Sequence, residues 1–363
     1  MNAAVISSYA YIKENVNYGS LFQYFALESF FKKNGIDSFW IKYEFSPKND
    51  LKSKIKHVVF YKFEKEKKII LNAFQSFCSK YLSLSDNSYT DSSLSCDKIS
   101  ADFFVTGSDQ VWGGELGANY LTFVTDGRMK VSFSASFGSN EICVEKANKI
   151  YPWLKEFDFI SVREKSGIVI CNKMGLKAIR IIDPTLLIDS SLYPSKITRQ
   201  NYWFCYFLNK GKEENGIFSS ISELAKKQKK SVFYPKCLQP QDQCKKFFFG
   251  LSLDPESWIG MYSNTEYVFS NTFHGIVFAI IFKKPFTCFL QNGKTRRQNE
   301  RLLDLLEHFG LEERIFNGRD VYISKQIDWK KVNLIISQDR INANDFLHSI
   351  QERVLNKGNY NEY

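Results

Sequence analysis

The opening of the chain alternates between short apolar runs and a helical pattern, and this alternation restricts the fold more than any other feature. Residues 3–7, Ala-Ala-Val-Ile-Ser, are mainly apolar, which is typical of a buried strand. A helical period then begins at Leu21 and ends at Asn34-Gly35, a common signal for a helix C-terminus. Residues 38–43, Ser-Phe-Trp-Ile-Lys-Tyr, are rich in aromatic and β-branched residues and predict a second strand. Strand, helix and strand in this order are the repeating unit of a parallel sheet, so the sequence predicts an α/β fold.

The same alternation continues along the chain and indicates two α/β halves. The first half has further predicted strands at 102–106, 130–135, 157–163 and 178–182. The pattern stops at Asp183-Pro184 because proline disfavours its continuation. It restarts with predicted strands at 201–208, 231–234, 267–270 and 285–290, and with predicted helices at 217–228, 272–283, 302–309 and 332–357. Ligands of open parallel sheets lie beyond the carboxyl ends of the strands, so two such halves favour a cleft between them.

The chain is strongly basic, with a formal net charge of +10. Seven lysines lie between Lys52 and Lys68 and are interleaved with apolar residues, which predicts a basic helical insertion over 48–98. This insertion either presents a solvated basic face or docks on the anionic inner leaflet of a membrane. A basic chain favours an anionic partner, such as a phosphorylated substrate, an anionic lipid or nucleic acid. Nucleic acid is not expected, because no nucleic-acid-binding motif is present.

The cysteines and the chain's apolar runs bear on its compartment. Eight cysteines form no Cys-x-x-Cys pair and are accompanied by only four histidines, so neither a zinc site nor a disulfide framework is expected. The first residues lack the pattern of a secretory signal, and the densest apolar run, 275–282, is too short to span a bilayer. We therefore expect a cytoplasmic protein, with the basic run as a candidate for peripheral contact with the inner face of the membrane.

Two candidate site residues follow predicted strands of the first half. Asp109 lies in a glycine-containing turn after the strand at 102–106, where it would either project into the cleft or serve as a plain turn residue. Arg163 ends the strand at 157–163 and could bind a carboxylate or a phosphate bidentately. The alternative for Arg163 is a structural ion pair with Glu164 or with another acid.

Two more candidates lie in the second half. His274 stands where a predicted strand meets a helix, and backbone N–H groups at a helix start favour an anion. The alternative is a histidine with a purely structural role. The run 291–301 contains one lysine and three arginines just before a helix. Because cations at a helix N-terminus oppose the helix dipole, an anionic ligand would account for them.

Six short motifs occur in an order and spacing that resemble the polysaccharide pyruvyl transferase family over roughly residues 1–310. They are Asn17-Tyr-Gly19 with Leu21-Phe-Gln-Tyr-Phe-Ala-Leu27, Thr106-Gly-Ser-Asp-Gln-Val-Trp112, Ser132-Phe-Ser-Ala-Ser-Phe-Gly138, Ser161-Val-Arg-Glu164, Asp183-Pro-Thr185 and Thr272-Phe-His-Gly275. The resemblance implies two Rossmann-like domains facing a cleft, as in glycosyltransferases of the B type. It also implies transfer of pyruvate from phosphoenolpyruvate onto sugar hydroxyls as a ketal, during cell-surface polysaccharide biosynthesis.

The resemblance also implies that different segments of the chain bind the acceptor and the donor. Residues 1–190 would form the acceptor-side domain, with the basic helical insertion inside it, and residues 195–325 the donor-side domain. Residues 326–363 would form a helical segment that packs back across the domains. The acceptor would be a sugar or a lipid-linked oligosaccharide, and phosphoenolpyruvate would be a co-substrate in a reaction that needs no metal and no other cofactor.

Residue roles follow from the same resemblance. Phosphoenolpyruvate would contact Arg163, Lys294, Arg301 and Thr272, whereas His274 would be catalytic or bind the phosphate. Asp109 would be catalytic at the acceptor hydroxyl, and the acceptor would contact Asn17, Gly19, Ser108 and Gln110. The family's Thr-Asp-Ser-Phe-His-Gly string appears here with Asn271 in place of its acidic residue, so a role for negative charge at that position is in doubt.

Two other functions compete with this one. A glycosyltransferase of the same fold could use a nucleotide sugar, and such enzymes often bind ribose through a Glu-x7-Glu pair. Here Glu156 and Glu164 have that spacing, but they flank a predicted strand of the first half and are interpreted as a coincidence. The second alternative is a non-enzymatic binder of anionic surfaces that uses the basic run.

Overall fold

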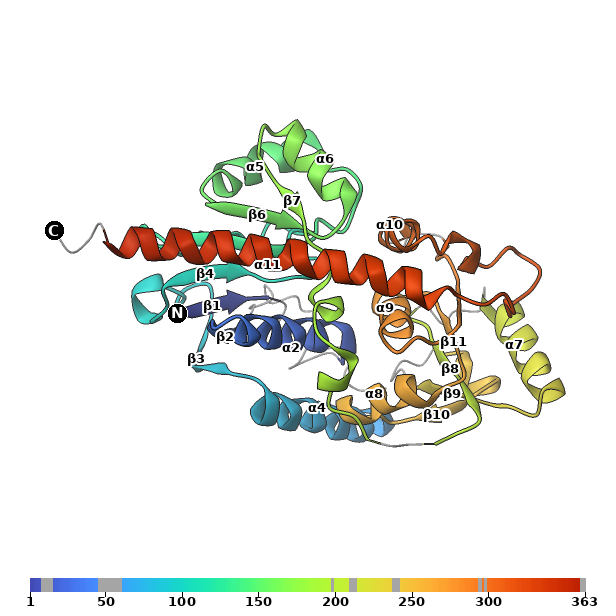
Figure 1. Cartoon of the computed structure of the whole chain (residues 1–363). Helices are drawn as coiled ribbons and strands as arrows, with labels where there is room; N and C mark the ends of the chain where they lie inside the picture. The colour runs from blue at the N-terminus through green and yellow to red at the C-terminus, as the bar shows by residue number, and fades with distance from the viewer. Residues whose placement is uncertain are drawn as a thin grey trace. The chain divides into compact units, whose positions relative to one another are not determined.

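The computed structural model describes residues 1–7, 16–44, 61–196, 199–208, 214–236, 242–292, 296 and 299–359 (Figure 1). For residues 61–65 and 357–359 it describes the backbone alone. Contacts divide the chain into two compact units. The first unit comprises Met1–Ser46, Cys78–Ile188 and Lys331–Tyr363, and the second comprises Pro47–Phe77 and Asp189–Lys330.

The first unit contains a seven-stranded sheet in which every described pairing is parallel. Its order is β3-β2-β1-β4-β5-β6-β7. The strands are β1 (Asn2–Ile6), β2 (Asp37–Tyr43), β3 (Leu84–Tyr89), β4 (Phe103–Thr106), β5 (Met129–Ala135), β6 (Phe159–Val162) and β7 (Ile179–Arg180). The chain moves outward in one direction from β1 to β3 and in the other from β4 to β7. The point between β1 and β4 is therefore the topological switch point, where open α/β sheets bind their ligands.

Helices cover both faces of this sheet (Figure 1). On one face, Phe133 of β5 packs against Phe31 of helix α2 (Tyr18–Lys33) and Phe346 of helix α11 (Trp329–Asn359). On the other face, Phe104 and Ile160 belong to a core that also includes residues of the remaining helices, α5 (Val144–Leu154) and α6 (Lys165–Lys173). Successive strand residues point to opposite faces, so strands buried on both faces are apolar at nearly every position.

The second unit repeats this plan with five strands in the order β10-β9-β8-β11-β12, again all parallel. They are β8 (Tyr202–Tyr206), β9 (Ser231–Pro235), β10 (Phe249–Leu251), β11 (Tyr267–Ser270) and β12 (Phe286–Cys288). One face packs on α7 (Asn215–Lys227) through Phe218, and the other packs on α8 (Pro255–Asn264) through Trp258 and Tyr262. Helices α9 (Phe273–Ile281) and α10 (Asn299–Phe309) also belong to this unit, whose switch point lies between β8 and β11.

The predicted fold class is confirmed, because both units are parallel α/β folds of Rossmann-like strand order. Each strand predicted from the sequence is present. Strands β3 and β10 and helices α5, α6 and α8 were not predicted.

The predicted helical insertion over 48–98 is correct only in part. Residues 48–60 lie outside the described residues. Helix α4 (Tyr61–Tyr81) follows them, and strand β3 follows α4, so the segment is not helical throughout. Strand β3 escapes prediction because its middle residues, Asp86 to Ser88, are polar and exposed.

Within the described part of the chain, no helix is long and apolar enough to cross a membrane.

Candidate functional site

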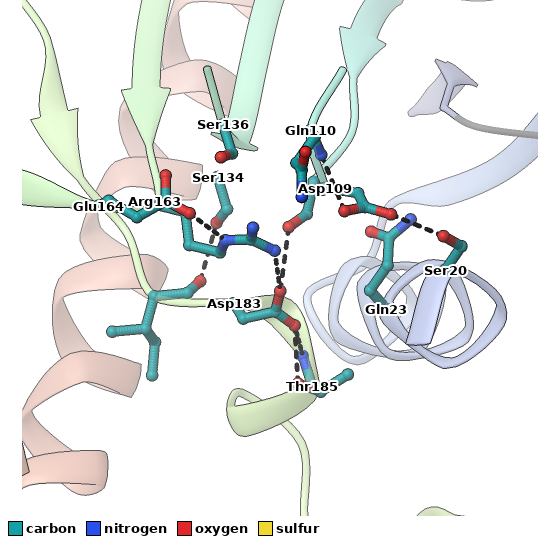
Figure 2. Close-up of polar contacts among 12 residues, drawn as sticks. Ser20, Gln23, Asp109, Gln110, Ser134, Ser136, Arg163, Glu164, Asp183 and Thr185 are labelled. Carbon is teal, nitrogen blue, oxygen red and sulfur yellow. Dashed lines mark hydrogen bonds and ion pairs between the residues drawn. The ribbon is translucent and has the colours of Figure 1, made fainter. Parts of the chain in front are cut away.

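A tight turn after β4 places Asp109 at the switch point of the first unit (Figure 2). The turn approaches β1 closely at Gly107, where an added Cβ would lie 3.3 Å from Val5 Cγ1 and 3.4 Å from Ser7 Cβ. Asp109 itself has a φ of +84°, a region that residues other than glycine rarely adopt. Such a conformation costs about 1–3 kcal/mol and persists only where the surroundings impose it, commonly at functional sites.

Two hydrogen bonds hold the Asp109 carboxylate in one orientation. Ser20 Oγ donates to Oδ2 at 2.6 Å, and the Gln110 backbone N–H donates to Oδ1 at 2.8 Å. Ser20 lies in the first turn of α2, where the Asn17 side chain caps the helix by accepting from the Ser20 N–H. Asp109 therefore lies beside a helix N-terminus, where a negative charge is favoured.

Arg163 lies at the end of β6 and makes two buried ion pairs (Figure 2). Its Nε contacts Glu164 Oε1 and its Nη1 contacts Asp183 Oδ2, each at 2.8 Å. Asp183 also accepts from Ser108 Oγ at 3.3 Å, and from the backbone N–H and Oγ1 of Thr185 at 3.1 and 2.7 Å. The structural ion pair with Glu164, which the sequence left open as an alternative, is thus present together with a second acid.

Three carboxylates surround the single positive charge of Arg163. Burial lowers the pKa of Arg163, but the carboxylates of Glu164, Asp183 and Asp109 together raise it, and the net direction is upward. The guanidinium is 2% exposed and stays charged. Arg163 and the three carboxylates carry an excess of negative charge, which is partly offset by Arg180, whose Nε donates to the Arg163 carbonyl at 3.3 Å. This group of side chains is therefore a poor place for an additional anion.

Buried hydroxyl and amide groups surround these charges. Gln23 Nε2 donates to Ser7 Oγ at 3.0 Å, and Ser7 Oγ donates to the Ser108 carbonyl at 3.2 Å. Ser134 has a φ of +57° and donates to the Ile182 carbonyl at 2.8 Å. We call the labelled residues of Figure 2 the first-unit cluster: Ser20, Gln23, Asp109, Gln110, Ser134, Ser136, Arg163, Glu164, Asp183 and Thr185.

The second unit has its polar residues where β11 leads into α9. Thr272 is the N-cap of α9, and its Oγ1 accepts from the Gly275 N–H at 2.9 Å. Ser270 Oγ donates to the Tyr206 carbonyl at 2.6 Å and accepts from the Thr272 N–H at 3.1 Å. A Cβ at position 275 would lie 2.1 Å from Ser270 Oγ and 2.5 Å from Thr272 Oγ1, so only glycine fits. The start of α9 is therefore fixed tightly against the end of β11.

Asn271 joins the ends of neighbouring strands. Its Oδ1 accepts from the Leu208 N–H at 3.0 Å, and its carbonyl accepts from Gln291 Nε2 at 2.8 Å. Gln291 is held in turn by Asn299 of α10 through two hydrogen bonds of 2.7 and 2.8 Å. These contacts use the neutral amide and the backbone carbonyl of Asn271, so they do not require an acidic residue at this position.

His274 and Arg301 both approach Phe273 at the start of α9. The His274 ring lies 5.2 Å from the Phe273 ring, and the Arg301 guanidinium lies 5.8 Å from the same ring. His274 is half-buried, whereas Arg301 is 8% exposed. We call these residues the second-unit cluster, made up of Ser270, Asn271, Thr272, Phe273, His274, Gln291 and Arg301.

The two units differ sharply in charge. The sequence of the second unit has 29 Lys and Arg against 18 Asp and Glu, a net charge of +11, whereas that of the first has 20 against 21, a net charge of −1. The whole positive excess of the protein therefore belongs to the second unit. Among the described residues, no group of three or more His, Cys, Asp or Glu side chains is arranged to hold a metal ion.

A protein-family model described as polysaccharide pyruvyl transferase matches residues 17–292. That span covers most of the chain, including Asp109, Arg163 and His274. The chain belongs to the polysaccharide pyruvyl transferase family. It is accordingly a transferase, and the resemblance drawn from the six motifs is confirmed.

Comparison with solved structures gives matches of low identity. UDP-GlcNAc 2-epimerase from Methanocaldococcus jannaschii, solved with UDP-GlcNAc and UDP, has 12% identity and a TM-score of 0.44, and the match covers 93% of this chain and 99% of that one. The UDP-GlcNAc 2-epimerase from Neisseria meningitidis has 12% identity and a TM-score of 0.45, with 98% and 100% covered. MurG from Acinetobacter baumannii has 8% identity and a TM-score of 0.45, with 97% and 99% covered. No curated protein matches the chain.

The residues singled out in the sequence of this pyruvyl transferase fall into the two clusters. Asn17, Gly19, Ser108, Asp109, Gln110 and Arg163 lie at or beside the first-unit cluster, and Thr272, His274 and Arg301 lie in the second-unit cluster. Lys294 lies outside the described residues. Their roles toward donor and acceptor stay predictions.

Several members of the first-unit cluster were not predicted as site residues from the sequence. Ser20 and Gln23 were part of a helical run with no assigned chemistry, although Ser20 bonds to Asp109. Asp183 and Thr185 were noted only as part of a family motif. Their signal was the Asp-Pro-Thr string itself, since aspartate before proline readily caps a turn.

We expect Arg163→Met to destabilise the protein strongly, by about 3–5 kcal/mol in the free energy of unfolding. The substitution leaves Asp183 and Glu164 buried without their cation. Urea unfolding followed by circular dichroism measures the effect, with Lys165→Met as a control because Lys165 is exposed. Equal stabilities for the two variants would show that the buried pairs are not structural.

Proposed function

We propose that this pyruvyl transferase moves pyruvate from phosphoenolpyruvate onto two hydroxyls of one sugar, forming a ketal during cell-surface polysaccharide biosynthesis. The observation that carries the proposal is the second-unit cluster, where a histidine stands in the first turn of a helix within a unit of net charge +11. Phosphoenolpyruvate carries a phosphate and a carboxylate, and this is the kind of surrounding that attracts such a ligand.

We assign the donor to the second unit. Backbone N–H groups at the start of α9 favour a phosphate, with His274 in the same turn and Arg301 near it. Thr272 fixes that turn by capping the helix. Lys294 stays a candidate contact from the family resemblance. Arg163 is a candidate contact in the family resemblance, but it lies in the first unit and its two buried ion pairs favour a structural task.

We assign the acceptor to the first unit. The first-unit cluster offers hydroxyl, amide and carboxylate groups, which can donate to and accept from sugar hydroxyls. Its excess of negative charge disfavours phosphate, which supports a neutral polyol at this edge of the sheet. Asp109 would accept the hydroxyl proton, and Ser108, Gln110, Asn17 and Gly19 would line the acceptor. A lipid-linked oligosaccharide is the form of acceptor that a cell-surface polymer would supply.

The chemistry needs an acid, a base and cationic groups. An acid protonates the methylene carbon of phosphoenolpyruvate, which leaves an oxocarbenium-like centre at C2. A first sugar hydroxyl adds to C2 and gives its proton to a base, and the C2–O bond to phosphate then breaks. A second hydroxyl adds to C2, and inorganic phosphate leaves with the remaining proton. Cations and helix N–H groups stabilise the phosphate as its charge grows.

Identification of the reaction product tests this proposal. Incubation of the protein with phosphoenolpyruvate and a panel of neutral saccharides should release inorganic phosphate. At least one saccharide should gain the mass of one pyruvate less one water. Parallel incubations with nucleotide sugars test glycosyl transfer. A glycosylated product from a nucleotide sugar, with no use of phosphoenolpyruvate, would contradict the proposal.

We expect His274→Gln to lower turnover about 100-fold or more, the usual scale for losing a positioned acid or base. Glutamine keeps a hydrogen-bond donor and much of the volume, so the melting temperature should change little. Steady-state kinetics and thermal unfolding measure the two effects, and His348→Gln is the matched control because His348 is exposed on α11. A variant that loses several degrees of stability but keeps its activity per folded molecule would make His274 a structural residue.

We also propose peripheral contact with an anionic membrane through the basic run. On helix α4 the apolar residues Ile70, Phe74 and Phe77 are buried in the protein, whereas Lys68 and Ile69 are exposed. The described part of this helix therefore supports attraction of charge to a surface more than insertion of an apolar face.

Replacing the seven lysines from Lys52 to Lys68 with glutamine should lower binding to anionic liposomes, by about 1 kcal/mol for each lysine that reaches the surface. Turnover of a soluble acceptor should stay intact. Liposome co-sedimentation measures binding, and the parent protein should show little affinity for neutral liposomes. Equal binding of the parent protein to neutral and anionic liposomes would dismiss the membrane contact.

A further inference from the structure

A cavity of about 670 Å³ lies in the first unit, at the edge of the sheet opposite the first-unit cluster. Its walls come from the loop before β5, the first residues of β5, the end of α5 and the loop before β6. The strands of this sheet run parallel, so these are their amino ends, whereas Asp109 and Arg163 lie at the carboxyl ends. A volume of this size fits a small ligand.

One wall of the cavity is rigid because the five N–H groups of Arg128 are all committed. They donate to the carbonyls of Cys96, Ile99 and Ala101. Through Nε and Nη2 they also donate to Asp126 Oδ2 in the same loop. The guanidinium also lies 4.7 Å from the Phe104 ring. This wall is therefore formed before any ligand arrives.

Lys130 supplies donors at the cavity. Its side chain is 8% exposed, which is unusual for a lysine, and its Nζ contacts Glu156 Oε2 at 2.6 Å. That contact uses one of three N–H groups of the ammonium. The Glu156 side chain is 53% exposed and lines the same cavity. A buried ammonium and an exposed carboxylate thus stand side by side, and together they offer hydrogen-bond donors and acceptors.

The cavity offers no excess of positive charge. Among its lining residues Arg128 and Lys130 are matched by Glu156 and Asp158, and Arg128 also pairs with Asp126, so an anion is not preferred. Thr122 and Thr125 add hydroxyls that both donate and accept. Trp153 adds an indole that is half-buried and packed against Tyr120 at 5.2 Å.

We propose that this cavity is a second saccharide-binding site, which takes a neutral sugar residue. Sugar hydroxyls each donate and accept hydrogen bonds, as the paired charges and threonines require, and the C–H faces of a sugar ring pack on an indole. The cavity would hold a part of a polymeric acceptor that does not react. Only this anchoring role rests on the proposed reaction, whereas saccharide binding does not.

Binding to an array of neutral and charged oligosaccharides tests the site without any turnover. The parent protein should bind neutral oligosaccharides, and Lys130→Met and Trp153→Leu should each weaken that binding about tenfold. Lys155→Met is the matched control for Lys130→Met, because Lys155 is exposed and does not line the cavity. His274→Gln, placed in the reaction machinery above, should bind as the parent does. Circular dichroism confirms that each variant is folded.

Three results would overturn the site: no neutral oligosaccharide binds the parent protein, binding is confined to charged oligosaccharides, or both cavity variants bind as well as Lys155→Met. The anchoring role has its own readout. In the pyruvyl transfer assay, Lys130→Met should raise KM for a polymeric acceptor about tenfold and leave KM for a monosaccharide acceptor unchanged. If the protein does not use phosphoenolpyruvate, this kinetic readout is lost, but oligosaccharide binding still decides the site.

Discussion

The buried contact between Arg163 and Asp183 joins parts of the first unit that are far apart in sequence. Arg163 follows the last residue of β6, and Asp183 caps the turn after β7. The hydroxyl of Ser108, from the turn after β4, bonds to the same carboxylate. A carboxylate buried this deeply is stable only with its partners, so the three strand ends are held in one arrangement. The turn that contains Asp109 follows directly from Ser108. The orientation of the candidate catalytic carboxylate thus depends on this ion pair.

The second unit reaches a similar result with uncharged groups. Asn271 bonds to the end of β8 and to Gln291, and Gln291 bonds to α10, so amide groups link the strand ends there. Gly275 lets α9 start directly on the hydroxyls of Ser270 and Thr272. A site built from amides and hydroxyls adds no negative charge to a unit of net charge +11. The two units therefore offer different electrostatic surroundings on the same kind of fold, as the proposed transfer from an anionic donor to a neutral acceptor requires.

The sequence alone predicted those features that depend on residues close together along the chain. Apolar runs located the strands of both sheets, and the glycine-containing turn after 102–106 located Asp109. Contacts between distant residues could not be predicted in this way. Ser20 meets Asp109 across 89 positions because α2 starts beside the end of β4, and no local pattern reports that. Strand β3 has polar central residues because it lies at the edge of the sheet, where one side need not be buried. The pairing of Arg163 with two acids was only one of the alternatives that its sequence allowed.

The most direct test of this account is where phosphoenolpyruvate binds. A crystal structure of the protein with phosphoenolpyruvate should show the phosphate within about 3 Å of backbone N–H groups in the first turn of α9, in contact with His274. The first-unit cluster should hold no phosphate. A phosphate bound among Asp109, Arg163 and Asp183, with the start of α9 empty, would contradict the assignment of the donor to the second unit.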